Sequence, residues 1–267
     1  MPKNIGKEKM KQLEQQLAEQ ERLLQAVMTK QEDNDSSLRF GLTSISASCI
    51  AEQYFCEKKV EMQYLHGRVE TESKLLGTEG HETLLIDTVK VKHAEIFKRI
   101  WSGRPIIAHE VLLLSRYRDL ILIGRPDAIV FSQAMPLFLF EYKFSRSPTP
   151  FNSHHVQAKV YGKILEGMGF ETRKLHYVLA VVPPTLKNDD ALFRKILHAS
   201  IKNGPQEARL EMEEASVYIH PYCSVDADQD ITWASDFWKG VREAIPTNNP
   251  NKCPSCEYKD KCILKER

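Results

Sequence analysis

The sequence predicts an α/β domain, in which helices flank a β-sheet. Strand-like segments follow one another between residues 120 and 144, and helix-like segments lie before and after them. In the central run, β-branched and aromatic residues are bounded by Gly124, Pro126 and Pro136, the pattern of short strands joined by turns. We therefore expect strands over 120–124, 126–131 and 137–144, with a break over 132–136.

The segments around this run have the composition of helices. Residues 46–67 are amphipathic, with Ser46 at the position of an N-cap and Gly67 just past the end. A helix over 71–101 would be interrupted near its start by Gly77 and Gly80. We also expect helices over 191–200 and 231–245, and a strand over 174–182.

Residues 1–37 differ from the rest of the chain in their sequence pattern. This pattern predicts a separate helix and a linker, ahead of a domain over 38–267. Apolar residues follow a seven-residue pattern, with Gln20 at one seam position: Met10, Leu13, Leu17, Leu24 and Val27. Only about two and a half heptads are present. Two interpretations stay open: a helix for self-association or partner docking, and a helix that frays or packs on the core. The polar run 31–37 reads as the linker.

Composition favours an intracellular enzyme. The chain has 267 residues, 42% hydrophobic and 27% charged, which suits one globular domain of about two hundred residues plus an appendage. No apolar run approaches the roughly 18 residues of a membrane span, and the N-terminus lacks the apolar core of a signal peptide. Six cysteines, three of them clustered, favour a reducing compartment such as the cytoplasm. The net charge of +1 gives no global evidence of nucleic-acid binding.

Two carboxylates and a lysine form the most informative feature. Asp127 opens one apolar run, while Glu141 and Lys143 end the next, so an antiparallel hairpin would bring all three to one end of a sheet. Period-two geometry puts Glu141 and Lys143 on one face and Tyr142 on the other. Carboxylates about 4 Å apart would repel by roughly 4 kcal/mol at an effective dielectric near 20, so the site needs a cation or a proton. Oxygen ligands suit Mg²⁺ or Mn²⁺. The alternative is an ordinary hairpin with a surface ion pair.

A downstream helix carries Gln157 and Tyr161, four positions apart and so on one face, where both could meet this site. Arg146 follows the last strand, and Lys159 and Lys163 lie on the same helix. We expect these three basic side chains to face phosphates.

Pro126-Asp127, Glu141-x-Lys143 and Gln157-x-x-x-Tyr161 resemble the core of the PD-(D/E)xK nuclease superfamily in its RecB-like branch, over about residues 40–267. The resemblance implies a restriction-endonuclease-like core, with a central mixed β-sheet flanked by helices. It also implies that Asp127, Glu141 and the Tyr142 carbonyl bind the catalytic Mg²⁺ or Mn²⁺. In this family Gln157 and Tyr161 would position the catalytic Lys143 and the nucleic acid.

One further ligand comes from the same resemblance. Gly77-x-x-x-His81 looks like the motif in which the RecB-like branch supplies a histidine to the catalytic metal, which makes His81 a metal ligand. Glu110 resembles a glutamate at the same position in the family, but it is not included in the expected site.

The C-terminus carries a second motif. Cys253, Cys256 and Cys262 form C-x2-C-x5-C, which leaves a soft metal site one ligand short. In a continuous helix over 46–67, Cys49 and Cys56 would lie about 10 Å apart along the axis, so both cannot bind one cluster. Cys223, the other candidate, is interpreted as a buried small hydrophobic residue. The spacing fits zinc as well as iron.

Residues 54–59 resemble the segment that supplies the distant ligand in RecB-like nucleases with an iron-sulfur cluster. The resemblance implies that Cys56 joins the three C-terminal cysteines around a [4Fe-4S] cluster, in a subdomain that connects the N- and C-terminal segments. Zinc and Cys49 stay open as alternatives.

The most similar family overall is the CRISPR-associated RecB-like iron-sulfur exonucleases, and related proteins serve in helicase-nuclease repair machines. The resemblance therefore implies an exonuclease acting on DNA, with CRISPR adaptation proteins or a helicase as partners. Two other readings stay open: a catalytically silent DNA-binding or scaffold protein, and a zinc-stabilised interaction module.

Overall fold

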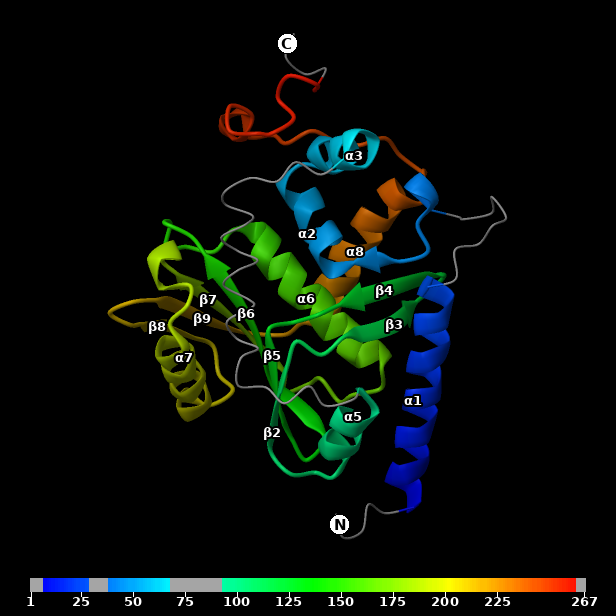
Figure 1. The fold of residues 1–267 in the computed structure, drawn as a ribbon, viewed down its shortest axis with the longest axis vertical. Coiled ribbons are helices and arrows are strands. Elements are labelled where there is room, and N and C mark those ends of the chain that lie inside the picture. Colours follow the sequence, from blue (N-terminus) through cyan, green and yellow to red (C-terminus); the bar gives the residue numbers. More distant parts are fainter. Residues whose placement is uncertain (1–6, 29–37, 68–92, 263–267) are drawn as a thin grey trace.

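The computed structural model describes residues 7–28, 38–67 and 93–262 (Figure 1). The helices are α1 Lys7–Met28, α2 Ala47–Phe55, α3 Glu57–His66, α5 His93–Trp101, α6 Asn152–Gly167, α7 Asp190–Asn203 and α8 Ser224–Trp238. The strands are β1 Ile45–Ser46, β2 Ile106–His109, β3 Leu113–Tyr117, β4 Leu120–Gly124, β5 Ala128–Ser132, β6 Met135–Phe144, β7 His176–Val182, β8 Ala208–Glu211 and β9 Ser216–Pro221. Short 3₁₀ helices span Arg39–Gly41, Pro184–Leu186 and Pro250–Lys252.

Two sheets organise the described residues. The larger sheet has the strand order β2-β5-β6-β7-β9-β8, in which β6 and β7 are parallel and the other pairs are antiparallel. Helix α6 is the crossover between the two parallel strands. The smaller sheet has the order β1-β4-β3. Helix α7 covers one face of the large sheet, whereas α6 lies on the other (Figure 1). The predicted α/β fold with a mixed sheet flanked by helices is confirmed.

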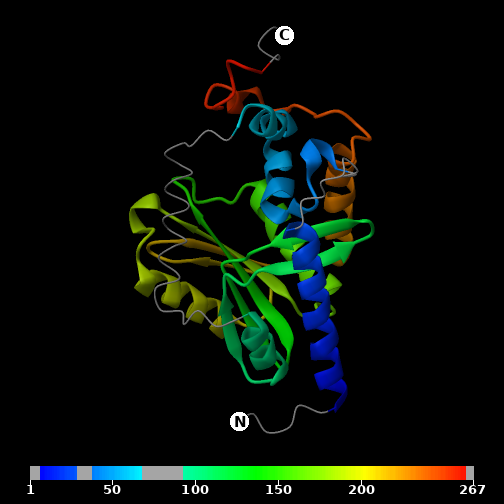
Figure 2. The same cartoon turned by 45° about the vertical axis from the view of Figure 1, so that its right-hand side comes forward.

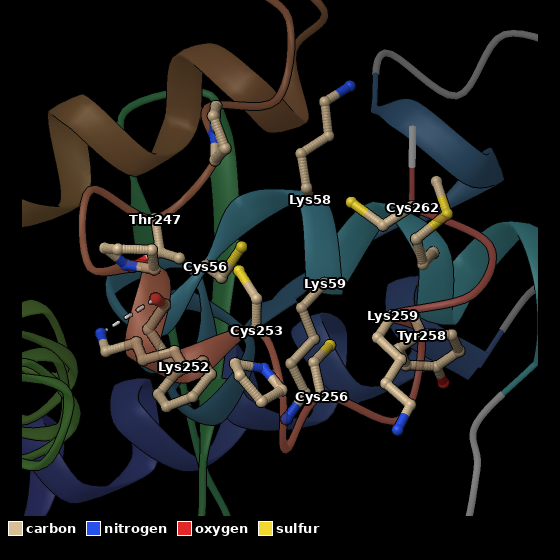
Figure 3. Close-up of a pocket in the computed structure, with 15 residues that line it drawn as sticks. Cys56, Lys58, Lys59, Thr247, Lys252, Cys253, Cys256, Tyr258, Lys259 and Cys262 are labelled. Atoms are coloured by element: carbon tan, nitrogen blue, oxygen red, sulfur yellow. Dashed lines mark hydrogen bonds between the residues drawn. The ribbon is translucent and has the colours of Figure 1, made fainter. Parts of the chain in front are cut away.

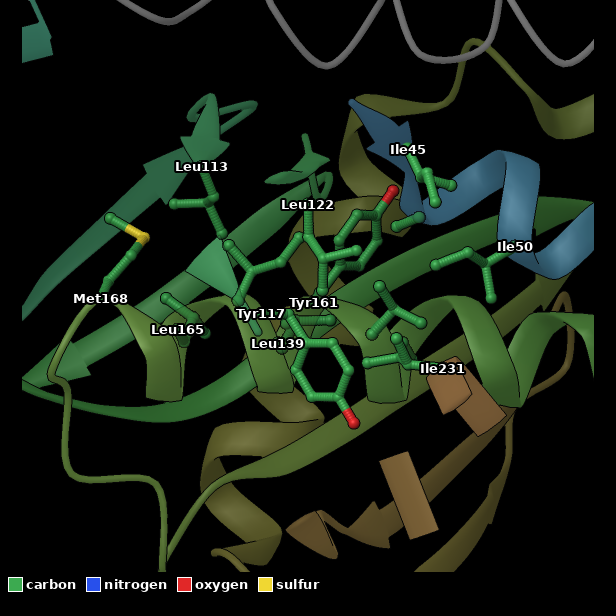
Figure 4. Close-up of a cluster of buried hydrophobic side chains, with 14 of the residues drawn as sticks. Ile45, Ile50, Leu113, Tyr117, Leu122, Leu139, Tyr161, Leu165, Met168 and Ile231 are labelled. Carbon is green, nitrogen blue, oxygen red and sulfur yellow. The ribbon is translucent and has the colours of Figure 1, made fainter. Parts of the chain in front are cut away.

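The central strands are buried on both faces. Leu139 of β6 belongs to the core on the α6 side (Figure 4), and so does Leu179 of β7. Phe140 and Val178 belong to the core under α7. Double burial explains why these strands read as nearly continuous apolar runs in the sequence. Polar side chains of these strands can therefore reach solvent or a ligand only near the strand ends, where Asp127, Glu141 and Lys143 lie.

The hairpin of β5 and β6 has the expected arrangement with a shorter turn. Gln133 and Ala134 both have positive φ, of 54° and 62°, as the two-residue turns that suit twisted hairpins require. Strand β6 therefore starts at Met135, inside the predicted break. Ala128 lies opposite Phe140, so Asp127 reaches the level of Glu141.

Two predicted helices are corrected. The helix over 46–67 is divided at Cys56, whose φ and ψ of −172° and 116° are extended. The helix over 231–245 is α8, which starts seven residues earlier and ends at Trp238, just before Gly240 turns the chain at a φ of +70°. Of the helix over 71–101, only α5 is described, and Gly77 and Gly80 lie outside the described residues.

Helix α1 packs on the core of its own chain, beside α5 and β3 (Figure 2). Its buried side chains are Leu13 and Gln20, which are expected seam positions, and Gln16 and Leu23, which lie one position before the expected Leu17 and Leu24. Met10 and Leu24 are exposed. Gln20 donates from Nε2 to the carbonyl of Leu114 and accepts from its N–H. The core-packed alternative thus describes this helix.

Candidate active site

The hairpin places two buried carboxylates at adjacent strand ends. Asp127 directly precedes β5 and is 4% exposed, and Glu141 near the end of β6 is 3% exposed. The backbone N–H of Tyr142 donates to Oδ2 of Asp127 at 2.6 Å, which ties the first carboxylate to the strand that carries the second. Two desolvated carboxylates at adjacent strand ends favour a bound cation.

Lys143 connects this pair to helix α6. Its Nζ donates to Oε1 of Glu141 at 2.7 Å and to Oε1 of Gln157 at 2.9 Å. Gln157 in turn donates from Nε2 to the hydroxyl of Tyr161 at 2.8 Å, and that hydroxyl donates to the carbonyl of Arg125 at 3.3 Å. The structure therefore brings together all five side chains that the sequence placed in the catalytic site.

The side chain of Tyr142 lies on the opposite face of β6, as the period of two requires. Its ring packs edge-on against Phe193 of α7, with the centroids 5.0 Å apart. Only the backbone of Tyr142 is therefore directed to the site, which is consistent with an expected role through its carbonyl.

The structure adds a third carboxylate. Glu110 follows β2 with a φ of 46°, and its N–H donates to the carbonyl of Asp127 at 3.1 Å. Burial and the charges of Glu141, Asp127 and Glu110 raise the pKa of Tyr161 well above its usual value, so its phenol stays protonated and serves as a donor. The pairing of β2 with β5 places Glu110 here, and no local sequence pattern shows that pairing.

The donor atoms suit a hard divalent cation, because they are carboxylate and carbonyl oxygens. In the part of the chain that the structure describes, no group of three or more His, Cys, Asp or Glu side chains is arranged to hold a metal ion. His81, the expected fourth ligand, lies outside the described residues. Within the described residues, the carboxylates of Asp127 and Glu141 are thus the main candidate ligands for such a cation.

A glycine leaves room for the tyrosine of this site. A Cβ added to Gly124 of β4 would lie 2.6 Å from the ring of Tyr161, which is too close for either group to remain in place. We expect Gly124→Ala to lower the free energy of unfolding by about 1–3 kcal/mol, the usual effect of overpacking. Urea unfolding measures this change, and an unchanged midpoint would show that the ring moves freely.

Four of the six cysteines gather between α3 and the C-terminal segment. Cys56, Cys253, Cys256 and Cys262 line one cavity of about 300 Å³ between α3 and the C-terminal segment (Figure 3). The same cavity is lined by four basic side chains: Lys58, Lys59, Lys252 and Lys259. Cys49 is buried elsewhere, with its Sγ 3.5 Å from the hydroxyl of Tyr64. Cys223 is exposed, so its interpretation as a buried hydrophobic residue is wrong.

A buried ion pair holds this region together. Glu57, which follows Cys56, is 1% exposed and accepts two hydrogen bonds from Arg242, at 2.5 and 2.8 Å. It also accepts from the backbone N–H of Ile245 at 2.8 Å. Because Ile245 leads into the cysteine-bearing segment, the pair fixes that segment against the corner between α2 and α3.

Two of the three basic side chains expected to face phosphates form ion pairs with other residues. Lys159 pairs with Asp230, and Lys163 donates to Glu166 at 3.0 Å and to Asp228 at 3.0 Å. These contacts direct both ammonium groups toward α8, which corrects the expectation that they face phosphates. Arg146 is exposed in the loop between β6 and α6 and stays available to an anionic ligand.

The fold and the side chains at its strand ends define an α/β domain of the nuclease class. A model of the PD-(D/E)XK nuclease superfamily matches residues 5–263. The chain therefore belongs to the PD-(D/E)XK nuclease superfamily.

Curated relatives match over short segments. Exonuclease V, mitochondrial, of Candida dubliniensis is 35% identical over 46 residues, which is 17% of this chain and 7% of the relative. The protein of the same name from Candida albicans is 35% identical over 52 residues, covering 20% and 8%. The matches thus span less than a tenth of these relatives' length. The crystal structure of SSO0001 has a TM-score of 0.50 at 17% identity over 98% of both chains, which shows a likeness of fold.

None of the helices in the described ranges is both long and apolar enough to cross a lipid bilayer.

Proposed function

We propose that this chain is a Mg²⁺- or Mn²⁺-dependent exonuclease that cleaves DNA. The observation that carries the proposal is the hydrogen-bonded arrangement of Glu141, Lys143 and Gln157 beside the buried Asp127. Structural stability alone gives no reason to bury two carboxylates together, since desolvating charges has a cost. The arrangement is instead suited to holding a cation and a phosphate.

Each residue of the site has a separate role in the proposed cleavage of a phosphodiester bond. A metal ion, when bound, would supply Lewis-acid chemistry: it would lower the pKa of a bound water molecule and offset charge that develops on the phosphate. Asp127, Glu141 and the carbonyl of Tyr142 would hold that metal, with His81 as a further proposed ligand. Lys143 is held between Glu141 and Gln157, so its ammonium is positioned to orient the attacking water and to stabilise negative charge. Tyr161 fixes the amide of Gln157 and therefore acts as a positioning residue.

A [4Fe-4S] cluster bound by Cys56, Cys253, Cys256 and Cys262 is the second part of the proposal. All four cysteines line one cavity, although the described residues contain no group of three such side chains already arranged around a metal. Sulfur donors favour iron-sulfur clusters or zinc. The lysines around the cavity would offset the negative charge of a cluster held by four thiolates. Zinc is the alternative occupant.

Metal analysis distinguishes these occupants. We expect protein purified without oxygen to be brown and to hold about four iron atoms per chain. Cys56→Ser should lose the colour and the iron, whereas Cys223→Ser, at an exposed cysteine outside the cavity, should keep both. A colourless protein with one zinc per chain would contradict the cluster.

DNA ends or single-stranded DNA are the proposed substrates, and CRISPR adaptation or DNA repair is the proposed setting, with adaptation proteins or a helicase as partners. The name of the Candida relatives supports exonucleolytic cleavage. Self-association through α1 remains a proposal that would use its exposed Met10 and Leu24.

Cleavage of end-labelled DNA tests the function. Linear single-stranded and double-stranded DNA labelled at one end, and circular single-stranded DNA labelled internally, are incubated with the full chain and Mn²⁺, with and without chelator. We expect linear DNA to be degraded from an end and circular single-stranded DNA to survive. Binding without cleavage of any DNA would instead support a catalytically silent DNA-binding protein that retains the fold.

A further inference from the structure

The first turn of α6 and the loop before it form a surface that the proposed mechanism does not use. Phe151, the N-cap residue of α6, is 53% exposed, although a phenylalanine ring is usually at least partly buried. The loop over 145–150 holds Pro148 and Pro150, and the carbonyl of Pro148 accepts a hydrogen bond from the hydroxyl of Tyr218 at 3.3 Å. The ring is thus presented to solvent from an anchored loop.

A histidine holds Phe151 in this position. The N–H of Phe151 donates to Nδ1 of His154 at 3.2 Å, and the N–H of His154 donates to the carbonyl of Phe151 at 2.9 Å. The two rings meet edge to face with their centroids 5.3 Å apart. Because Nδ1 accepts a hydrogen bond, the neutral imidazole carries its proton on Nε2. Burial, together with the charge of Lys143, lowers the pKa of His154 to about 3, which keeps the ring neutral.

Phe151 and His154 lie on the same side of α6 as the proposed catalytic residues Gln157 and Tyr161. Phe151, His154, Gln157 and Tyr161 are spaced by three, three and four positions, so they lie along one side of the helix. Exposure rises along this line, from the buried Tyr161 through the half-buried Gln157 and His154 to the exposed Phe151. Six residues of helix place Phe151 about 9 Å along the axis from Gln157. A nucleotide that flanks a phosphate bound at Lys143 lies within that range.

We propose that Phe151 is a stacking platform for an unpaired nucleobase next to the scissile phosphate, and that His154 is the positioning residue that holds it. This inference rests on the proposed nuclease function, and it specifies a single-stranded substrate segment at the site. An exposed aromatic ring stacks on a base of any sequence, whereas a paired base inside a duplex offers no free face. The platform thus favours single strands without selecting a sequence.

Binding measured without divalent metal tests the platform separately from cleavage. The probes are a fluorescent single-stranded oligonucleotide and a fully abasic oligonucleotide of the same length. We expect Phe151→Ala to weaken binding of the first about tenfold, to leave binding of the second unchanged, and to be rescued by Phe151→Trp. Ile201→Ala is the matched control, because it also removes an exposed apolar side chain, on α7, and should bind as wild type.

Each outcome decides one proposal. Wild-type affinity of Phe151→Ala for the oligonucleotide with bases would overturn the platform, as would a wild-type protein that binds no single-stranded DNA. Equal weakening toward both probes would also overturn it, since a stacking contact needs a base. If wild type binds and Phe151→Ala behaves as expected but no DNA is cleaved in Mn²⁺, the platform stands and the nuclease proposal fails.

Discussion

We expect Lys143→Ala to slow cleavage of DNA by about a hundredfold to ten-thousandfold, the usual range for losing a residue that stabilises charge or helps transfer a proton. The ammonium is held by Glu141 and Gln157, so its position is defined before substrate binds. Alanine removes the charge and also leaves Glu141 without this cation. The measurement is the initial rate on end-labelled DNA at saturating Mn²⁺.

The matched control is Lys202→Ala, which removes an exposed ammonium from α7 and should cleave at the wild-type rate. Gln157→Ala should have a smaller effect, because Glu141 still holds the lysine. Near wild-type cleavage by Lys143→Ala, with a wild-type melting curve, would remove Lys143 from the mechanism.

The largest effect on stability is expected for Arg242→Ala. This variant leaves the buried carboxylate of Glu57 without its cation, and breaking a buried pair from one side typically costs about 3–5 kcal/mol. We expect about 3 kcal/mol, since Arg242 is partly exposed and Glu57 keeps the hydrogen bonds from Gln53 and Ile245. Urea unfolding of the whole chain measures the loss.

A double variant separates the buried charge from lost packing. Glu57→Gln combined with Arg242→Met removes both charges and should recover part of the stability, because no unpaired charge then remains buried. Arg173→Ala is the control, since Arg173 pairs with Glu171 on the surface, and its unfolding midpoint should not change. A wild-type midpoint for Arg242→Ala would show that the pair contributes nothing to holding the C-terminal segment.

The hairpin that carries Asp127, Glu141 and Lys143 could be predicted because its signals are local. Gly and Pro bound the apolar runs, and the period of two orders Glu141, Tyr142 and Lys143 on the two faces. Gln157 and Tyr161 followed from helical spacing. These rules need no knowledge of distant residues, and the structure brings the side chains together as they require.

Features that depend on distant contacts could not be predicted. The helices α2 and α3 are divided at Cys56, next to Glu57, which is held by Arg242 and Ile245 almost two hundred residues away. On the buried face of α1, Gln16 and Gln20 donate hydrogen bonds to the backbone carbonyls of Met168 and Leu114. The hydrophobic pattern gives no sign that Gln16 is buried, because the partner of this polar side chain is distant in the sequence. Strands β8 and β9 were also missed.

The central claim is that Asp127 and Glu141 hold the metal that cleaves DNA. The direct test is the rate of cleavage by chelator-treated protein as Mn²⁺ is added, for wild type, Asp127→Asn and Glu141→Gln. We predict that wild type is inactive without Mn²⁺ and recovers as it is added, and that both variants stay inactive at every concentration while melting as folded proteins. Cleavage by either variant at the wild-type rate and Mn²⁺ dependence would contradict the claim.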